Sequence, residues 1–424
     1  MTLLKTSALN GVAVLTKVGT ALLLNKILAV YVGPTGYAVI GQFQSLVGIV
    51  TGLASGAVGI GVTKYTAEYH AQPQRQLSVW HTGLKLGLGA SLAGALVLLI
   101  AREPLAEWLL ADRTYASVFV WLAFAIVLMV GNGLMLAIMN GRKAIGAFVG
   151  ANIGGSLINA GTAVVLVLSH GLYGALVALC IGQALAALAT AWIFRRACAI
   201  PWSSLWGNFD TEVARRLGGF ALMAAVSAVV VPMSQVIIRD HLADTLGWQT
   251  AGLWQALSKI SDLHLMLVTT TLVAYFLPRF AELPAGPQLR REVLRAYRFV
   301  LPLIVITAGT IFALRKPLVQ GMLTAEFLPL TEALGWQLFG DGIKICSWVA
   351  GYTLISHARV QLFVFCEFLF SALLVGFTYA GASLDGLRGT AIAYAVTYML
   401  HGLTMFALLL RYTHVCSSST SARG

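Results

Sequence analysis

Long apolar runs separated by short polar gaps follow one another along the whole chain. An α-helix needs about 20 apolar residues to cross the ~30 Å hydrocarbon core of a bilayer, and about twelve runs reach that length. Glycine, proline and charged residues fill the gaps, as at Gly33-Pro34. The pattern predicts an all-α polytopic membrane protein of about 12 transmembrane helices, which cover residues 6–32, 36–62, 78–101, 116–139, 145–168, 172–194, 217–239, 252–278, 297–315, 334–356, 360–380 and 388–411.

The composition excludes a soluble globular protein. Of the 424 residues, 58% are hydrophobic and only 10% are charged, and the mean hydropathy is +0.82. The longest gaps, 195–216 and 279–298, are too short to fold as a soluble domain. The first apolar run is too long for a signal peptide and is interpreted as the first span. The five cysteines form no close pair, so we expect no disulfide framework, no metal cluster and no cofactor.

Basic residues are unevenly distributed between the two sides of the predicted spans. With the N-terminus in the cytoplasm, the cytoplasmic gaps and tails carry 17 Lys and Arg residues, against 6 in the opposite gaps. This bias places both termini in the cytoplasm. It also accounts for the formal net charge of +12, so the basic composition does not require nucleic-acid binding.

Two short echoes indicate that the chain is doubled. Gly171-Leu172-Tyr173-Gly174 opens one span, and Gly386-Leu387-Arg388-Gly389 opens another 215 residues later. Because six crossings per half is an even number, both halves start on the same side, and a cleft is expected between them. This predicts two six-helix lobes around a central cavity, at 1–200 and 217–411, with a cytoplasmic linker at 201–216 and a cytoplasmic tail at 412–424.

Eight ionisable residues lie inside the predicted spans, where charge is costly. An ionised side chain at the bilayer centre costs about 2.5–3.5 kcal/mol on insertion scales, so eight facing lipid would cost about 20 kcal/mol or more. They are therefore expected to face an aqueous cavity or one another. The eight are Lys17, Lys26, Lys85, Lys259, Lys344, Asp262, Asp341 and Glu367.

Helical spacing places several of these residues on common faces with other polar and aromatic side chains. Such stripes, present in both halves, predict a polar chamber that binds substrate. The stripes comprise Gln255, Lys259 and Asp262 in one span, Gln337, Asp341, Lys344, Trp348 and Tyr352 in a second, and Asn152, Ser156 and Asn159 in a third. The alternative is local pairing within a helix, of Lys259 with Asp262 and of Asp341 with Lys344.

Local pairing does not account for the lysines of the first half, because Lys17, Lys26 and Lys85 have no acidic residue inside the same predicted spans. Lys26 has a second interpretation, in which its long side chain reaches the interface. The simplest interpretation of Lys17 and Lys85 is a cationic cavity that receives an anion, with lysine acting as a point charge for phosphate.

The acidic residues have a second possible use as ion-coupling groups. Burial raises the pKa of a carboxyl group and a nearby lysine lowers it, so such a group can exchange a proton or hold Na⁺ as its surroundings change. Glu367 has no basic residue within one helical turn in the sequence and is the first candidate, with Asp262 and Asp341 beside it. The alternative for Glu367 is a neutral side chain held by a hydrogen bond.

Four sequence segments resemble the Wzx-type flippases of the polysaccharide transporter family. They are Lys26 to Gly36 with Gly33-Pro34, Gly61 to His70 with Lys64, Leu253 to Asp262 with Trp254-Gln255, and Trp336 to Asp341 with Trp336-Gln337. They recur in register over nearly the whole chain. Within the family, the lipid III flippases of enterobacterial common antigen show the resemblance most closely and the O-antigen flippases next.

The resemblance implies the fold of the multidrug and toxic-compound extruders, with two six-helix lobes around a V-shaped cavity. It implies a substrate of undecaprenyl pyrophosphate carrying a short oligosaccharide, moved between leaflets of the bacterial inner membrane. Membrane lipids, H⁺ or Na⁺, and the polymerase and chain-length regulator of polysaccharide assembly are the partners that it suggests.

Two other functions remain open. A cation or drug antiporter on the same fold would favour an acidic cavity, whereas lysines outnumber acids inside the predicted spans by five to three. A polyprenyl-dependent membrane glycosyltransferase would need a sizeable extramembrane loop with catalytic groups. The acidic gap at 102–115 is short and is expected to lie at the membrane interface.

Overall fold

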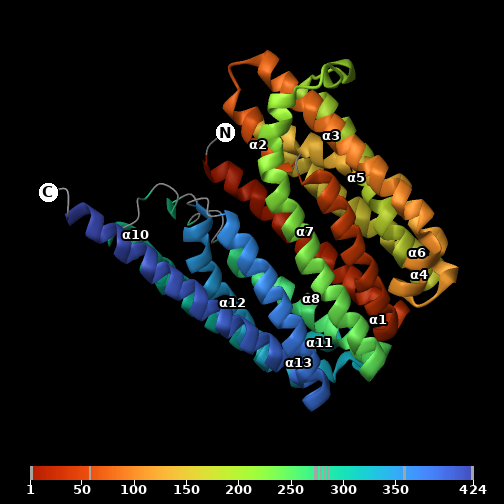
Figure 1. The fold of residues 1–424 in the computed structure, drawn as a ribbon. Helices are drawn as coiled ribbons and strands as arrows, with labels where there is room; N and C mark the ends of the chain where they lie inside the picture. Colours follow the sequence, from red (N-terminus) through yellow and green to blue (C-terminus); the bar gives the residue numbers. More distant parts are fainter. Residues whose placement is uncertain are drawn as a thin grey trace. The chain divides into compact units, whose positions relative to one another are not determined.

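The computed structural model describes the backbone of residues 3–56, 59–271, 276, 279–280, 283, 287–356 and 360–421. Within these residues every regular element is a helix (Figure 1). This confirms the all-α class expected from the apolar runs.

Three helices are long enough to contain two predicted spans each: α1 (Leu3–Ser55), α6 (Ile145–Cys198) and α13 (Val360–Ser421). Each one breaks at a glycine with positive φ, at Gly33 (φ 66°), Gly171 (φ 54°) and Gly386 (φ 52°). L-residues with a side chain rarely adopt this conformation, so glycine marks the place where the chain turns between two crossings. These breaks coincide with three of the predicted gaps.

The other predicted spans correspond to single helices or helix pairs. Six candidate membrane spans are identified by length and composition within the described residues, and they include the three long helices. Helices α7, α8 and α12 are not among the six. The remaining helices are α2 (Gly59–Glu68), α3 (Pro73–Ile100), α4 (Arg102–Leu110), α5 (Ala116–Gly141), α7 (Thr211–Leu246), α8 (Trp248–Thr271), α10 (Pro287–Ala313), α11 (Arg315–Met322) and α12 (Leu330–Ser356).

The order of elements repeats in the two halves. In each half a short helix, α4 or α11, and a 3₁₀ turn, 113–115 or 325–327, connect the third crossing to the fourth. Gly171 (φ 54°, ψ −129°) and Gly386 (φ 52°, ψ −133°) have almost the same conformation at the break before the last crossing. The internal repeat suggested by two sequence echoes is therefore visible in the backbone.

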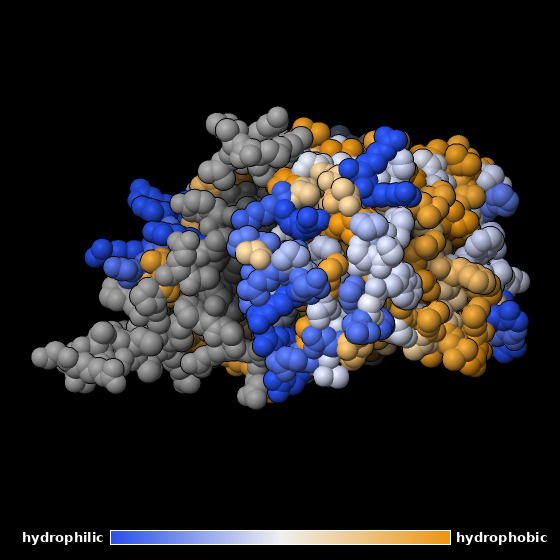
Figure 2. Space-filling view, turned by 90° about the horizontal axis from the view of Figure 1, so that it is seen from above, coloured by the Kyte–Doolittle hydropathy of each residue, from blue (hydrophilic) through white to orange (hydrophobic). Residues whose placement is uncertain are grey.

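The chain forms two compact units, Met1–Val236 and Ile237–Gly424. The division lies inside α7, so the lobe boundary expected at 201–216 stays a prediction. Each unit has an apolar core: Val62, Trp80, Leu134 and Phe194 belong to the first, and Val300, Ile345, Val349 and Met405 to the second. On the face drawn in Figure 2, hydrophilic residues gather together and hydrophobic residues cover the flank beside them, as expected for helices that enter a bilayer.

In the first unit, three side chains of α3 form hydrogen bonds with the segment before α7. Ser78 Oγ donates to Asp210 Oδ2 at 2.8 Å, His81 Nε2 lies 3.0 Å from the carbonyl oxygen of Ser204, and the Asp210 amide donates to Thr82 Oγ1 at 3.1 Å. The hydrogen bond from Ser78 is the main cause that holds the pKa of Asp210 below its ordinary value, and the Val213 amide adds to it.

Candidate functional site

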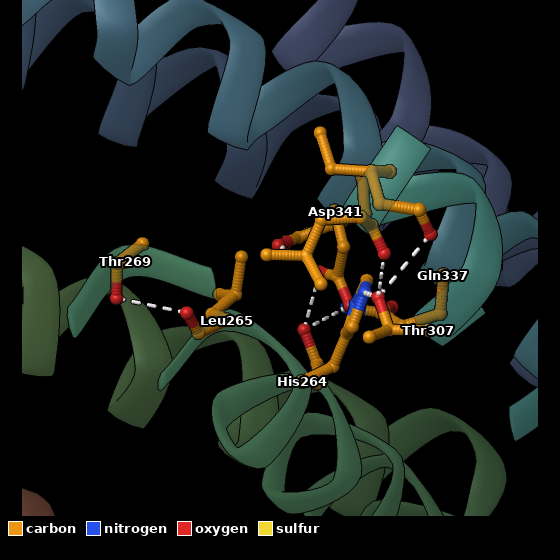
Figure 3. A network of polar contacts seen from close by, with 10 residues as sticks. His264, Leu265, Thr269, Thr307, Gln337 and Asp341 are labelled. Carbon is orange, nitrogen blue, oxygen red and sulfur yellow. Dashed lines mark hydrogen bonds and ion pairs between the residues drawn. The ribbon is translucent and has the colours of Figure 1, made fainter. Parts of the chain in front are cut away.

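A carboxylate with no solvent exposure lies at the centre of the second unit. Asp341 of α12 accepts hydrogen bonds at Oδ1 from Ser261 Oγ at 2.5 Å and from Tyr394 Oη at 2.8 Å. Its Oδ2 lies 3.2 Å from Nδ1 of His264, which is equally buried. Figure 3 shows Asp341 facing His264 across this contact. A buried carboxylate is tolerated only when hydrogen-bond donors replace the lost water. The hydroxyls of Ser261 and Tyr394 are such donors, and Nδ1 of His264 is a third when it carries a hydrogen.

The network extends from Asp341 to two further side chains. His264 Nε2 lies 3.0 Å from Thr307 Oγ1 of α10, and Gln337 Nε2 donates to Ser261 Oγ at 3.3 Å (Figure 3). Four helices, α8, α10, α12 and α13, therefore contribute polar groups to one buried site. Among the described residues, the buried side-chain polar atoms without a hydrogen-bond partner are Asn132 Oδ1 and Thr324 Oγ1, which belong to neither this network nor its neighbours.

Close approach between α12 and α13 brings Tyr394 to Asp341. A Cβ atom at Gly340 would lie 2.5 Å from the Tyr394 ring and 3.1 Å from the Ala395 backbone. Only glycine leaves room for the tyrosine at this crossing, as small residues do where membrane helices pack tightly. Gly340 therefore allows the two helices to pack closely, and the adjacent Asp341 supplies the polar group.

Lys344, one helical turn after Asp341, points at aromatic rings. Its Nζ lies 4.6 Å from the ring centroid of Tyr398, 5.2 Å from that of Trp348 and 5.5 Å from that of Tyr394. Cation–π attraction stabilises an ammonium group in such surroundings. Tyr394 therefore contacts both Asp341, through its hydroxyl, and Lys344, through its ring.

Lys259 and Asp262 of α8 form an ion pair, with Nζ 3.7 Å from Oδ2. Their side chains are 35% and 66% exposed, so the pair lies at the surface of its unit. Local pairing, one of the two interpretations of these residues, is therefore observed for this pair. The oxygens of Asp341 are occupied instead by groups from other helices.

The other candidates of the second unit lie in different surroundings. Gln255 is buried and accepts a hydrogen bond from the fully buried Arg239 at 3.0 Å. Glu367 is half-buried on α13. The side chain of Tyr352 lies outside the described residues.

The candidates of the first unit are separate from one another in the contacts that the structure gives. Lys17 of α1 and Lys85 of α3 are exposed, and Lys26 is half-buried. Asn152 and Asn159 of α6 each donate to a carbonyl of their own helix, at 2.8 and 2.9 Å. Local bonds of this kind satisfy an amide in a membrane helix and leave its second face available.

Sequence reasoning missed His264 and Thr307. Ser261 and His264 are three residues apart on α8 and share a face, which lies beside the stripe of Gln255, Lys259 and Asp262. An intramembrane histidine on such a face was a readable signal. Thr307 gave none, because a threonine in an apolar helix commonly bonds its own backbone.

Comparisons with known proteins place the chain among transporters. Lipid III flippase of Escherichia coli (strain K12) is 31% identical over 401 residues, which are 95% of this chain and 96% of that protein. Lipid III flippase of Shigella flexneri gives the same values. No protein-family model matches the chain.

Solved structures of the same fold have low sequence identity. An inward-facing multidrug resistance MATE family transporter of the MOP superfamily aligns with a TM-score of 0.76 at 15% identity, over 94% of this chain and 95% of its own. An outward-facing one aligns at 0.70 and 17% identity, over 97% of each chain. A MOP superfamily transporter from Pyrococcus furiosus aligns at 0.68 and 15% identity, over 95% of each. The chain therefore has the twelve-helix transporter fold of two six-helix lobes.

Proposed function

Because the chain belongs to the lipid III flippase family, we propose that it moves an oligosaccharide linked to undecaprenyl pyrophosphate from the cytoplasmic to the periplasmic leaflet of the inner membrane. The observation that carries this proposal is the 31% identity over 401 residues, which spans almost the whole of both chains. The protein is a multi-pass membrane transporter and not an enzyme, so the proposal concerns its substrate and its driving force.

The chemistry of this substrate fits a transporter with charge inside its spans. A pyrophosphate cannot cross hydrocarbon unaided, and each sugar hydroxyl is costly to remove from water. The polyprenyl tail is apolar and is stable in the lipid. A flippase must therefore shelter the headgroup while the tail stays in the membrane, and two lobes that rock against each other would provide alternating access.

Lysines on membrane-spanning helices would bind the pyrophosphate. The exposure of Lys17 and Lys85 supports this role, because an ammonium group turned toward lipid would cost about 2.5–3.5 kcal/mol and one turned toward an anion would not. Lys26, Lys259 and Lys344 would complete the cationic set. The sugar would contact polar and aromatic groups, for which we propose Asn152, Asn159, Gln255, Gln337, Trp348 and Tyr352.

An ion gradient would drive the cycle through the acidic residues of the second unit. Asp341 is the strongest of the three candidates, since it is buried and contacts three groups on two other helices, α8 and α13. Asp262 is neutralised by Lys259 at 3.7 Å, and it would act only after that pair opens. Glu367 remains a proposed coupling residue.

We propose that both termini lie in the cytoplasm, on the evidence of the Lys and Arg distribution. In this orientation the short helices α4 and α11 lie on the periplasmic side. Released substrate would then reach the polymerase and chain-length regulator of polysaccharide assembly on the side where these proteins use it.

The test is the flipping of a fluorescent lipid-pyrophosphate glycan in proteoliposomes. We expect Lys17→Ala and Lys85→Ala to reduce the initial flipping rate at least tenfold while the purified proteins stay monodisperse. Lys316→Ala, in the extramembrane helix α11, is the matched control and should flip at the wild-type rate. Wild-type activity in both intramembrane variants would contradict the cationic-cavity argument. Efflux of a cationic dye without glycan flipping would favour the drug antiporter instead.

A further inference from the structure

We propose that the coupling ion is a proton and that it is held between Nδ1 of His264 and Oδ2 of Asp341. This inference rests on the proposed function, because a coupling ion has a meaning only in a transporter. It follows from an assignment of the hydrogen atoms in the network that is based on the donor–acceptor distances.

Thr307 indicates whether Nε2 of His264, the ring nitrogen that does not face Asp341, carries a hydrogen. Its hydroxyl has a single hydrogen, and the carbonyl oxygens of Leu303 and Ile304 lie 2.7 and 3.2 Å from Oγ1. We assign this hydrogen to the shortest contact, the carbonyl oxygen of Leu303, so that Thr307 accepts from His264 Nε2 at 3.0 Å. Nε2 of His264 thus carries a hydrogen.

The inner side of the imidazole then requires an additional proton. In a neutral ring with its hydrogen on Nε2, Nδ1 presents a lone pair to Asp341 Oδ2 at 3.2 Å. Two lone pairs facing each other repel, and a proton between them converts the contact into a hydrogen bond. Without it the pair carries one negative charge, and with it the pair is neutral. With the hydrogens assigned in this way, the geometry is that of the loaded site.

Oδ1 of Asp341 is not available for this proton. Ser261 directs its hydrogen to Oδ1 at 2.5 Å, because its own oxygen accepts from Gln337. Tyr394 directs a second hydrogen to Oδ1 at 2.8 Å. The exchangeable proton is thereby confined to the side of His264.

The same arrangement disfavours a metal cation. A hard cation such as Na⁺ is bound by several oxygen lone pairs. Here the hydroxyl hydrogens of Ser261 and Tyr394 point at the carboxylate, and the next neighbour is an imidazole nitrogen. A cation placed on Asp341 would meet these hydrogens, whereas a proton fits the network as it stands.

Release of the proton needs only a small rearrangement. If the hydroxyl of Thr307 rotates from the Leu303 carbonyl to Nε2, Nε2 releases its hydrogen and accepts from Thr307, while Nδ1 keeps its hydrogen and donates to Asp341. The carboxylate then stays fully hydrogen-bonded while charged.

The helices around the site carry several other titratable or charged groups. They are Lys259 and Asp262 on α8, Lys344 on α12, and Tyr394, Tyr398 and His401 on α13. α10 contributes Thr307, which does not titrate.

Two measurements test the proposal, and the first needs no transport. Nitrogen NMR of ¹⁵N-histidine protein in detergent distinguishes a ring with both nitrogens protonated from each neutral tautomer. His264→Gln assigns the signal among the eight histidines of the chain. We expect a signal from His264 with both ring nitrogens protonated, and we expect this signal to be absent in Asp341→Asn. A neutral ring with its hydrogen on Nδ1 throughout the range from pH 5 to pH 9 would overturn the proposal.

The second measurement is flipping under imposed gradients. We expect a pH gradient to change the wild-type rate at least threefold and an equal Na⁺ gradient to leave it unchanged. His264→Gln and Asp341→Asn should lose the response to pH, whereas His170→Gln, an exposed histidine outside the network, should keep it. A response to Na⁺ alone, or a full pH response in both variants, would refute the proton site. Absence of flipping in the wild type would refute the proposed function, and the NMR result would then decide the proton site by itself.

Discussion

The two halves of the molecule differ in the side chains that converge at similar places along the repeat. In the second unit, Asp341 meets His264, which meets Thr307. The positions 213 to 215 residues earlier are Ile126, Val50 and Gly94. These also converge, because a Cβ atom at Gly94 would lie 3.3 Å from Val50 Cγ1 and 3.6 Å from Ile126 Cδ1.

The comparison separates what the fold needs from what function adds. Ile126 and Asp341 both have no solvent exposure. An apolar trio is therefore sufficient to join three membrane helices at this place in the repeat. The carboxylate and imidazole of the second unit are costly to bury and are not required for packing, which supports a functional role.

The surface of the repeat is alike in both halves. Trp121 and Phe124 on α5 correspond to Trp336 and Phe339 on α12, again 215 residues apart, and all four are exposed. Aromatic residues at such positions commonly lie at the membrane interface. The two units thus resemble each other where they meet lipid and differ in their interior.

Removal of the carboxylate alone is expected to have the largest effect on stability. Asp341→Ala leaves Ser261, His264 and Tyr394 without their acceptor, and loss of one partner of a buried charged network costs about 3–5 kcal/mol. Chemical unfolding in detergent should show this loss. An unfolding free energy equal to that of the wild type would mean that the network contributes nothing to the second unit.

Tyr394→Phe should have a smaller effect. It removes one hydrogen bond to the carboxylate, worth about 1.5–3 kcal/mol, and keeps the ring beside Lys344. Lys344→Met is the companion variant that removes the charge and keeps the hydroxyl. We expect the tyrosine variant to change the share of His264 rings with both nitrogens protonated, as seen by NMR, and to keep the fold. An unchanged NMR spectrum of His264 would show that Tyr394 does not contribute to the site.

The smallest effect concerns the segment before α7, in the first unit. Ser78 holds the pKa of Asp210 below its unfolded value, so Asp210 stabilises the fold above that unfolded value, and the stabilisation is lost as pH falls through the folded pKa. Asp210→Asn should therefore lower the melting temperature at pH 7. The difference from the wild type should shrink as the pH falls below about 4. A difference that is constant with pH would point to packing instead of charge.

Much of this architecture is readable from the sequence. Runs of apolar residues give the crossings, and Gly33, Gly171 and Gly386 mark the turns because only glycine tolerates that backbone. The repeat was detectable from one pair of matching four-residue segments.

The interior of the site was less predictable. The stripe of Gln337, Asp341 and Lys344 indicates which helix face is polar, but the partners of Asp341 come from two other helices. Periodicity along one helix carries no information on which residue of another helix it meets. Thr307 is the clearest case, since its role depends on the direction of one hydroxyl hydrogen.

The most direct test makes the buried site of the second unit apolar, as the trio of the first unit is. A variant with Asp341→Ile, His264→Val and Tyr394→Phe replaces the buried network by apolar groups, and such exchanges are often neutral or stabilising by about 1–4 kcal/mol. The measurement is glycan flipping in proteoliposomes with and without an imposed pH gradient. We predict a folded protein whose flipping rate no longer responds to the gradient. A folded triple variant with the full wild-type response would contradict the assignment of coupling to this network.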